Sequence, residues 1–144
     1  MTTDPDVARV LGIEPRSRRP MALIDEVGDG LPVSALESVA RQVAPQDSGF
    51  AYRLVPRATL ARRRKERPGR RKLSPDEGAK VTRLAEVWAM AVKVWGGEEE
   101  ARAFLQRPHP MLDGRRPLDV VLASEFGRPL VEGILGQLQH GSAA

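Results

Sequence analysis

The chain has 144 residues, a net charge of +4 and 41% hydrophobic residues, which suffices for the core of one or two small domains and excludes a wholly disordered chain. It contains no cysteine, so disulfide frameworks, thiol catalysis and cysteine-bound zinc are excluded. Only 4% of the residues are aromatic, which predicts an aliphatic core and argues against a stacking platform for single-stranded nucleic acid.

The beginning of the chain offers no targeting signal and little regular pattern. The first twelve residues lack the cationic start and apolar run of a signal peptide, and no stretch approaches the roughly 20 apolar residues of a membrane-spanning helix. We therefore expect a soluble, cytoplasmic protein without membrane contact. Residues 1–20 have no periodicity, Arg16–Pro20 is expected to form a loop, and residues 21–27 are too few to classify. Residues 1–29 are thus expected to be variable and partly flexible.

Residues 30–72 predict a helix-turn-helix arrangement. Leu36, Val39, Ala40 and Val43 recur at helical spacing, and Ser34 with Glu37 forms the pattern of a capping box, which predicts a helix over 34–43. A short helix is expected over 48–54 and a third from Arg57 to about Glu66, with Pro56 at its first position. These lengths and turns are typical of a DNA-reading helix pair.

A concentrated positive charge coincides with the third helix. Residues 53–72 contain ten Lys/Arg and one acid, so this basic segment carries +9 and the rest of the chain −5. Such a cluster attracts a polyanion, because counterion release scales with local phosphate contacts. Helix-turn-helix geometry would place Arg57 and Thr59 near base edges and put a run of cations on phosphates: Arg62, Arg63, Arg64 and Lys65. The alternative is a solvated basic linker that keeps the protein soluble.

The clearest helix signal is Ser74-Pro75-Asp76-Glu77, a serine cap, a proline at the first position and a glutamate at the third. The helix that follows carries one apolar stripe until Gly96-Gly97: Val81, Leu84, Ala85, Trp88, Ala91, Val92 and Trp95. We interpret both tryptophans as core anchors. Glu98–Gln106 predicts a short helix with its three acids at the positive end of the helix dipole.

The remainder predicts two more helices. After a turn at Leu112-Asp113-Gly114, Pro117 opens a helix through about Ala123, and the last helix runs from Phe126 or Arg128 to Gln139. The last helix is expected to bury Val131, Ile134, Leu135 and Leu138, to end at His140-Gly141 and to be followed by the tail Ser142–Ala144. No strand pattern of useful length occurs, so the predicted fold is all-α.

The residues do not support an enzyme. There is no phosphate-binding loop, no dinucleotide fingerprint and no nucleophile with a plausible base. His109 and His140 are 31 residues apart and the chain has no cysteine ligands, which argues against a metal site. We expect no catalysis, no metal and no cofactor.

The C-terminal half resembles the toxin-binding domain of Xre/MbcA/ParS-type antitoxins. The most diagnostic run is Phe-Leu-x2-Pro-x3-Leu-x-Gly-x2-Pro-Leu, from Phe104 to Leu118. Further matching positions are Leu73-Ser74-Pro75-Asp76-Glu77, Trp95-Gly96, Ala101, Glu125-Phe126-Gly127, Val131, Leu135 and Gly141. Arg57–Arg63 resembles the family's degenerate Xre-like recognition helix, and the likeness covers about residues 30–141.

This resemblance implies a division into residues 30–72, a degenerate Xre-like helix-turn-helix, and residues 73–144, a toxin-binding domain. It implies a RES-domain toxin that uses NAD as partner, an antitoxin homodimer inside the toxin–antitoxin complex, and operator DNA as a second partner. The last helix and tail would occlude the toxin's NAD cleft. Because the apolar stripe of that helix is expected to face the core, the toxin contacts are expected from its polar or terminal residues: Arg128, Leu130, Gln137, His140, Gly141, Ser142, Ala143 and Ala144. The alternative is a helix-turn-helix transcription regulator without a toxin partner, and a neighbouring toxin gene would discriminate the two.

Overall fold

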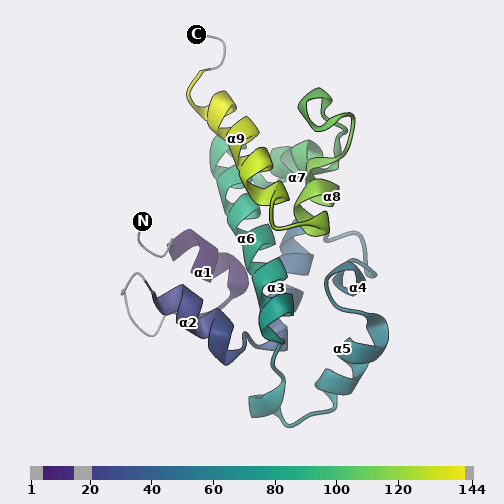
Figure 1. Ribbon diagram of the computed structural model, residues 1–144. Coiled ribbons are helices and arrows are strands. Elements are labelled where there is room, and N and C mark those ends of the chain that lie inside the picture. The colour runs from purple at the N-terminus through teal and green to yellow at the C-terminus, as the bar shows by residue number, and fades with distance from the viewer. Residues whose placement is uncertain (1–4, 15–20, 142–144) are drawn as a thin grey trace. The chain divides into compact units, whose positions relative to one another are not determined.

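The computed structural model describes residues 5–14 and 21–141 of the chain. The expected loop at Arg16–Pro20 and the tail Ser142–Ala144 lie outside these described residues. Within them every regular element is a helix (Figure 1), and extended segments pair only in two isolated antiparallel bridges, Pro32 with Lys72 and His109 with Arg115. The prediction of an all-α fold is confirmed.

The helices belong to two compact units, Met1–Ala85 and Glu86–Ala144. The first unit contains α1 (Pro5–Leu11), α2 (Ala22–Asp29), α3 (Val33–Val43), α4 (Ala51–Leu54), α5 (Arg57–Arg64) and the 3-10 turn η1 (Pro68–Arg70). The second contains α7 (Glu98–Gln106), the 3-10 turn η2 (Pro110–Leu112), α8 (Pro117–Ala123) and α9 (Gly127–Gln139). Helix α6 (Pro75–Trp95) begins in the first unit and ends in the second.

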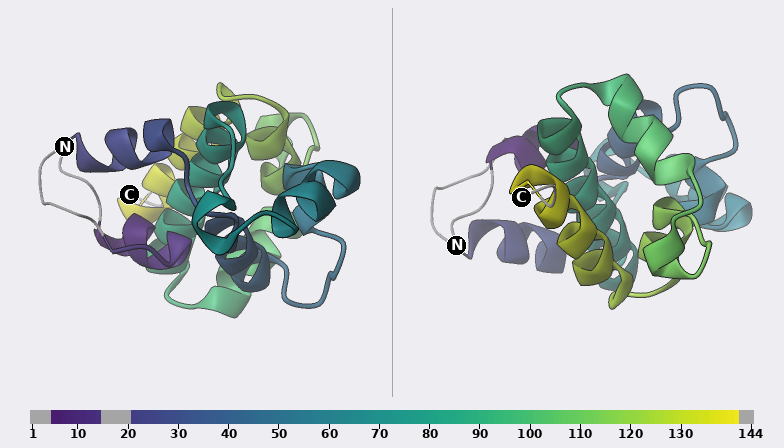
Figure 2. Two further views of the ribbon diagram at one scale, coloured as in Figure 1. Left: turned by 90° about the horizontal axis from the view of Figure 1, so that it is seen from below. Right: turned by 90° about the horizontal axis from the view of Figure 1, so that it is seen from above.

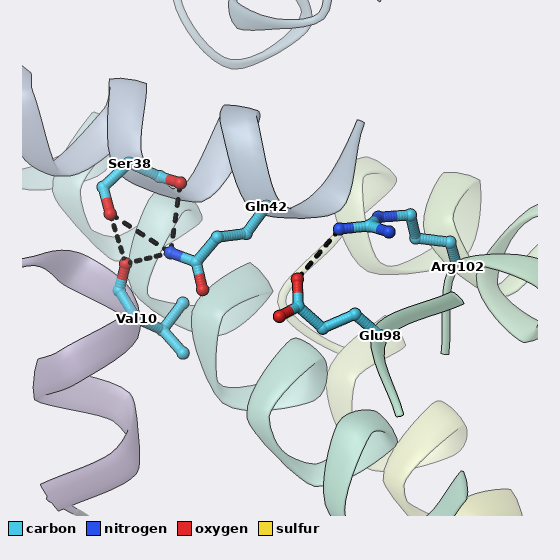
Figure 3. A network of polar contacts seen from close by, with 5 residues as sticks. All are labelled: Val10, Ser38, Gln42, Glu98 and Arg102. Carbon is cyan, nitrogen blue, oxygen red and sulfur yellow. Dashed lines mark hydrogen bonds and ion pairs between the residues drawn. The ribbon is translucent and has the colours of Figure 1, made fainter. Parts of the chain in front are cut away.

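The N-terminal helix α1 was not expected. The sequence showed no periodicity here, yet Pro5–Leu11 is a helix that buries Val7, Ala8, Val10 and Leu11 and packs against α3. The Ser38 hydroxyl and the Gln42 side-chain amide both donate to the Val10 carbonyl oxygen at 2.8 Å (Figure 3). Seven residues are too few to display a helical period, so tertiary contacts rather than a local pattern stabilise this helix.

Helix α3 begins without the predicted capping box. Its N-cap is Pro32, no side chain caps it, and Ser34 is exposed inside the helix. The Val33 amide instead donates to the Arg71 carbonyl oxygen at 2.8 Å, and Glu37 forms an ion pair with Arg64. A backbone contact with a segment distant in sequence therefore closes the start of α3, which no local pattern could predict.

Both helices of the predicted helix-turn-helix pair exist but are shorter than expected. The four-residue α4 starts at Ala51, because residues 45–50 form a turn in which the Asp47 carboxylate accepts from the Gly49 amide at 2.9 Å. Helix α5 ends at Arg64, and Pro56 is its N-cap rather than its first helical residue. The order helix, two-residue connection, helix is confirmed.

Helix α6 starts as predicted. The Ser74 amide donates to Glu77 Oε1 at 2.8 Å and the Glu77 amide donates to Ser74 Oγ at 3.3 Å, which is a complete capping box. Gly96, at a φ of 80°, ends the helix. The core interpretation of the tryptophans is confirmed for Trp88, which is 1% exposed, and is wrong for Trp95, which is 41% exposed.

The second unit follows the predicted boundaries closely. The turn at Asp113 and Gly114 has φ values of 56° and 79°, and Pro117 opens α8. Helix α8 packs against both α7 and α9 (Figure 2). Three of the four predicted core residues of α9 are buried, but Leu138 is 41% exposed and that prediction is wrong. Leu138 lies in the last turn of α9, where the apolar stripe continues beyond the packed part of the unit.

Candidate functional site

The candidate nucleic-acid surface is built on α5, which one buried side chain anchors. Leu60 is fully buried in the first unit, and Val55 is buried in the connection that precedes the helix. The Leu60 amide donates to the Pro56 carbonyl oxygen at 2.9 Å, which forms the first turn of α5. Since only Leu60 of α5 is buried, the rest of the helix presents its side chains to the surface of the unit.

The two residues expected near base edges lie at the N-terminus of α5. The guanidinium carbon of Arg57 lies 4.0 Å from the centre of the Tyr52 ring, a cation–π contact that holds this side chain against α4. Thr59 is half-buried, whereas Arg57 itself is exposed. The stacking therefore orients Arg57 without removing its charge from the surface.

Two of the four expected phosphate contacts are engaged inside the protein. Arg63 is half-buried and forms an ion pair with Glu77, the residue that also caps α6. Arg64 pairs with Glu37 of α3 at 2.9 Å. These two arginines tie α5 to α6 and to α3, a structural use that the charge pattern did not reveal.

The other two expected phosphate contacts remain available. Arg62 and Lys65 are exposed, and neither side chain forms a hydrogen bond or an ion pair with the described residues. The chain then returns through η1, and the end of the basic segment is held in place because the Leu73 amide donates to the Leu31 carbonyl oxygen at 2.7 Å. The basic segment is therefore largely exposed, while contacts within the first unit hold its two ends in place.

The surroundings of Lys80, in α6, shift the pKa of its ammonium group. The Lys80 ammonium donates to the Arg53 carbonyl oxygen at 2.8 Å. Burial, followed by the charges of Arg83 and Arg53, lowers the pKa of Lys80 below its usual value. The lowered pKa of Lys80 therefore reflects its partial burial first and the neighbouring positive charges second.

The second candidate surface is an exposed face of α9, here called the α9 strip. It consists of residues spaced four, three and four apart, which share one side of a helix: Phe126, Leu130, Gly133 and Gln137. Phe126 is 73% and Leu130 59% exposed. Phe126 was not among the expected contacts, although its spacing of four from Leu130 is the signal that could have found it.

Of the five expected toxin contacts that lie within the described residues, the structure groups four. Leu130 and Gln137 lie on the α9 strip, and His140 and Gly141 are exposed just beyond its end. Arg128 instead pairs with Glu132 at 2.8 Å and lies 3.9 Å from Glu86, so it links α9 to α6 within the second unit. The expected contacts at Ser142, Ala143 and Ala144 lie outside the described residues.

No alternative chemistry is assembled elsewhere in residues 5–14 and 21–141. No three His, Asp or Glu side chains of these residues come close enough together to hold a metal ion. Likewise, none of the helices described combines the length and apolarity needed to cross a bilayer.

Both candidate surfaces lie in parts of the chain that match known protein families. Residues 22–86 match the antitoxin Xre-like helix-turn-helix domain, and residues 90–141 match the antitoxin Xre/MbcA/ParS C-terminal toxin-binding domain. The chain is also 30% identical over 125 residues to a protein named antitoxin Xre from Yersinia enterocolitica serotype O:8 / biotype 1B, covering 85% of this chain and 82% of that protein. The chain therefore belongs to the Xre/MbcA/ParS-type antitoxins of toxin–antitoxin systems.

Proposed function

We propose that this antitoxin neutralises a RES-domain toxin, an enzyme that uses NAD for ADP-ribosyl transfer or NAD degradation. The α9 strip and the residues after it would enter the toxin's cleft and exclude NAD. The observation that carries this proposal is the pair of exposed apolar side chains on α9, Phe126 and Leu130, inside the residues that match a toxin-binding domain. We propose that the chain acts by binding, without catalysis of its own.

The α9 strip has the composition of a protein interface. An aromatic and an aliphatic side chain exposed one turn apart supply apolar area for burial, and such anchors dominate the binding energy of most interfaces. Gly133 has no other atoms within 4 Å of the position its Cβ would take, so a partner backbone can approach the helix closely there. Gln137 and His140 continue the strip with polar groups that suit a substrate cleft.

Co-expression with the toxin encoded by the neighbouring gene tests this proposal. Leu130→Asp places a charge in the proposed interface and should weaken toxin binding at least about tenfold. Ile24→Asp is the matched control, because Ile24 is 60% exposed, close to the 59% of Leu130, but lies in the first unit. Deletion of residues 139–144 should leave the fold intact and weaken protection from the toxin. Full protection by the truncated chain would refute occlusion by the tail.

We also propose that the antitoxin represses its own operon as a homodimer. A two-fold operator is bound most simply by two copies of a helix-turn-helix unit. The internal ion pairs of Arg63 and Arg64 support a revised set of contacts, in which Arg57, Arg62 and Lys65 reach DNA while the other two arginines position α5. Mass determination of the toxin–antitoxin complex tests the homodimer.

A further inference from the structure

A groove separate from the α9 strip lies in the second unit. Its volume is about 360 Å³, and it is formed by the end of α6, by α7 and the turn after it, and by the last turn of α9. Its wall is largely apolar: the Trp95 and Phe104 ring centres are 5.9 Å apart, the Phe104 and His109 ring centres are 6.3 Å apart, and Leu138 also lines the groove.

The groove is lined by the two residues that were predicted to be buried in the core but are exposed. Trp95 and Leu138 continue the apolar stripes of α6 and α9, yet each is 41% exposed. The Trp95 ring is the largest apolar side chain that the second unit leaves partly uncovered, and together with Leu138 and Phe104 it forms a contiguous apolar surface of the kind that marks interaction sites. No described residue covers the groove, so both stripes extend past the intramolecular core into an open site.

We infer that this groove receives an apolar side chain of the toxin, as a second contact beside the α9 strip. The inference rests on the proposed function. Every lining residue lies within 90–141, the part of the chain that matches a toxin-binding domain, and Leu138 shares α9 with Leu130 and Gln137. A toxin that covers α9 therefore reaches the groove without leaving this domain.

The charges at the groove fit a protein partner. Glu100 and Arg107 are exposed beside the apolar wall, and neither has an ion-pair partner among the described residues. An apolar centre with a charged rim is the usual composition of a protein–protein contact. The groove therefore fits an aliphatic or aromatic anchor flanked by polar residues of the toxin.

The two tryptophans permit a direct test on the full chain. The antitoxin is labelled with 5-fluorotryptophan, mixed with the unlabelled toxin, and observed by fluorine NMR, while complex formation is measured separately by mass. The Trp95 resonance should shift on complex formation, and the Trp88 resonance should not, because Trp88 is 1% exposed. A complex that forms with an unchanged Trp95 resonance overturns this inference and leaves the proposed function standing. Absence of any complex overturns both.

A variant that fills the groove gives an independent measurement. Ala103 is exposed on α7 and lines the groove, so Ala103→Arg should block it and weaken toxin binding at least tenfold. Ala123→Arg is the control, because Ala123 is also exposed but lies outside the groove, at the end of α8. Equal affinity of the two variants refutes the inference.

The same spectra distinguish the toxin from two other occupants of the groove. A Trp95 shift that depends on the concentration of antitoxin alone assigns the groove to a second copy. A shift on deletion of residues 142–144 without toxin assigns it to the chain's own end. Either result overturns the assignment to the toxin.

Discussion

Gly127 begins α9 at a point where the backbone of α8 lies against it. It is buried, and a Cβ at this position would meet the Val120 carbonyl oxygen well inside van der Waals contact. The obstacle is backbone rather than a flexible side chain, so the helices would have to separate. This explains why this chain has a glycine at the start of α9.

We expect Gly127→Ala to lower the free energy of unfolding by about 1–3 kcal/mol, the range for overpacking a tight contact. The control is Gly136→Ala on the same helix, where a Cβ meets no atom within 4 Å. That variant should instead gain up to about 1 kcal/mol, because alanine has the higher helix propensity. Urea unfolding of both variants measures the difference, and equal stabilities would contradict this account of Gly127.

At the scale of elements, the cations of α5 have two roles: some are free to contact DNA, and others hold the helix in position. The side chains of Arg62 and Lys65 are exposed and have no partners among the described residues, whereas Arg63 forms an ion pair with Glu77, which caps α6. An exposed cation that contacts a phosphate contributes to the salt dependence of DNA binding. An arginine in an internal ion pair contributes to the position of its helix.

Two variants of α5 distinguish the arginine that contacts DNA from the arginine that positions the helix. Arg62→Gln should weaken binding to the antitoxin's own promoter DNA and lower the slope of log affinity against log salt by about one, with unfolding unchanged. Arg63→Gln should lower the stability of the first unit, because Glu77 is left half-buried without its cation. Titrations at several salt concentrations, beside thermal unfolding, measure both effects. A full salt-slope change in Arg63→Gln with unchanged stability would reverse the two roles.

At the scale of the whole molecule, one helix belongs to both compact units. The sequence places a domain boundary between residues 72 and 73, at the start of α6, and this division stays a prediction. The compact units meet inside the helix, between Ala85 and Glu86, and the two family matches adjoin there as well, at residues 86 and 90. The buried residues Val81 and Leu84 lie in the first unit, and Ala91 lies in the second.

Amide hydrogen exchange as a function of denaturant decides between these divisions. We expect the amides of Val81 and Leu84 to exchange with the same opening free energy as Leu36, a core residue of the first unit, and Ala91 to exchange with Leu135. Exchange of all of α6 together with Leu135 would instead place the boundary at residue 72.

The sequence by itself determined what local chemistry controls. The Ser74–Glu77 capping box, the Asp113-Gly114 turn and the boundaries of α7 and α8 depend on residues within a few positions of each other, and their predictions are confirmed. The spaced residues from Phe104 to Leu118 also sufficed to indicate the family.

The tertiary structure alone decided where long-range contacts compete with local pattern. It made α1 a helix through contacts with α3, engaged Arg63 and Arg64 in ion pairs with Glu77 and Glu37, and left Trp95 and Leu138 exposed although their spacing predicts burial. The physical reason is the same in each case: helical periodicity shows which side of a helix is apolar, but which neighbour covers that side depends on segments far away in the chain.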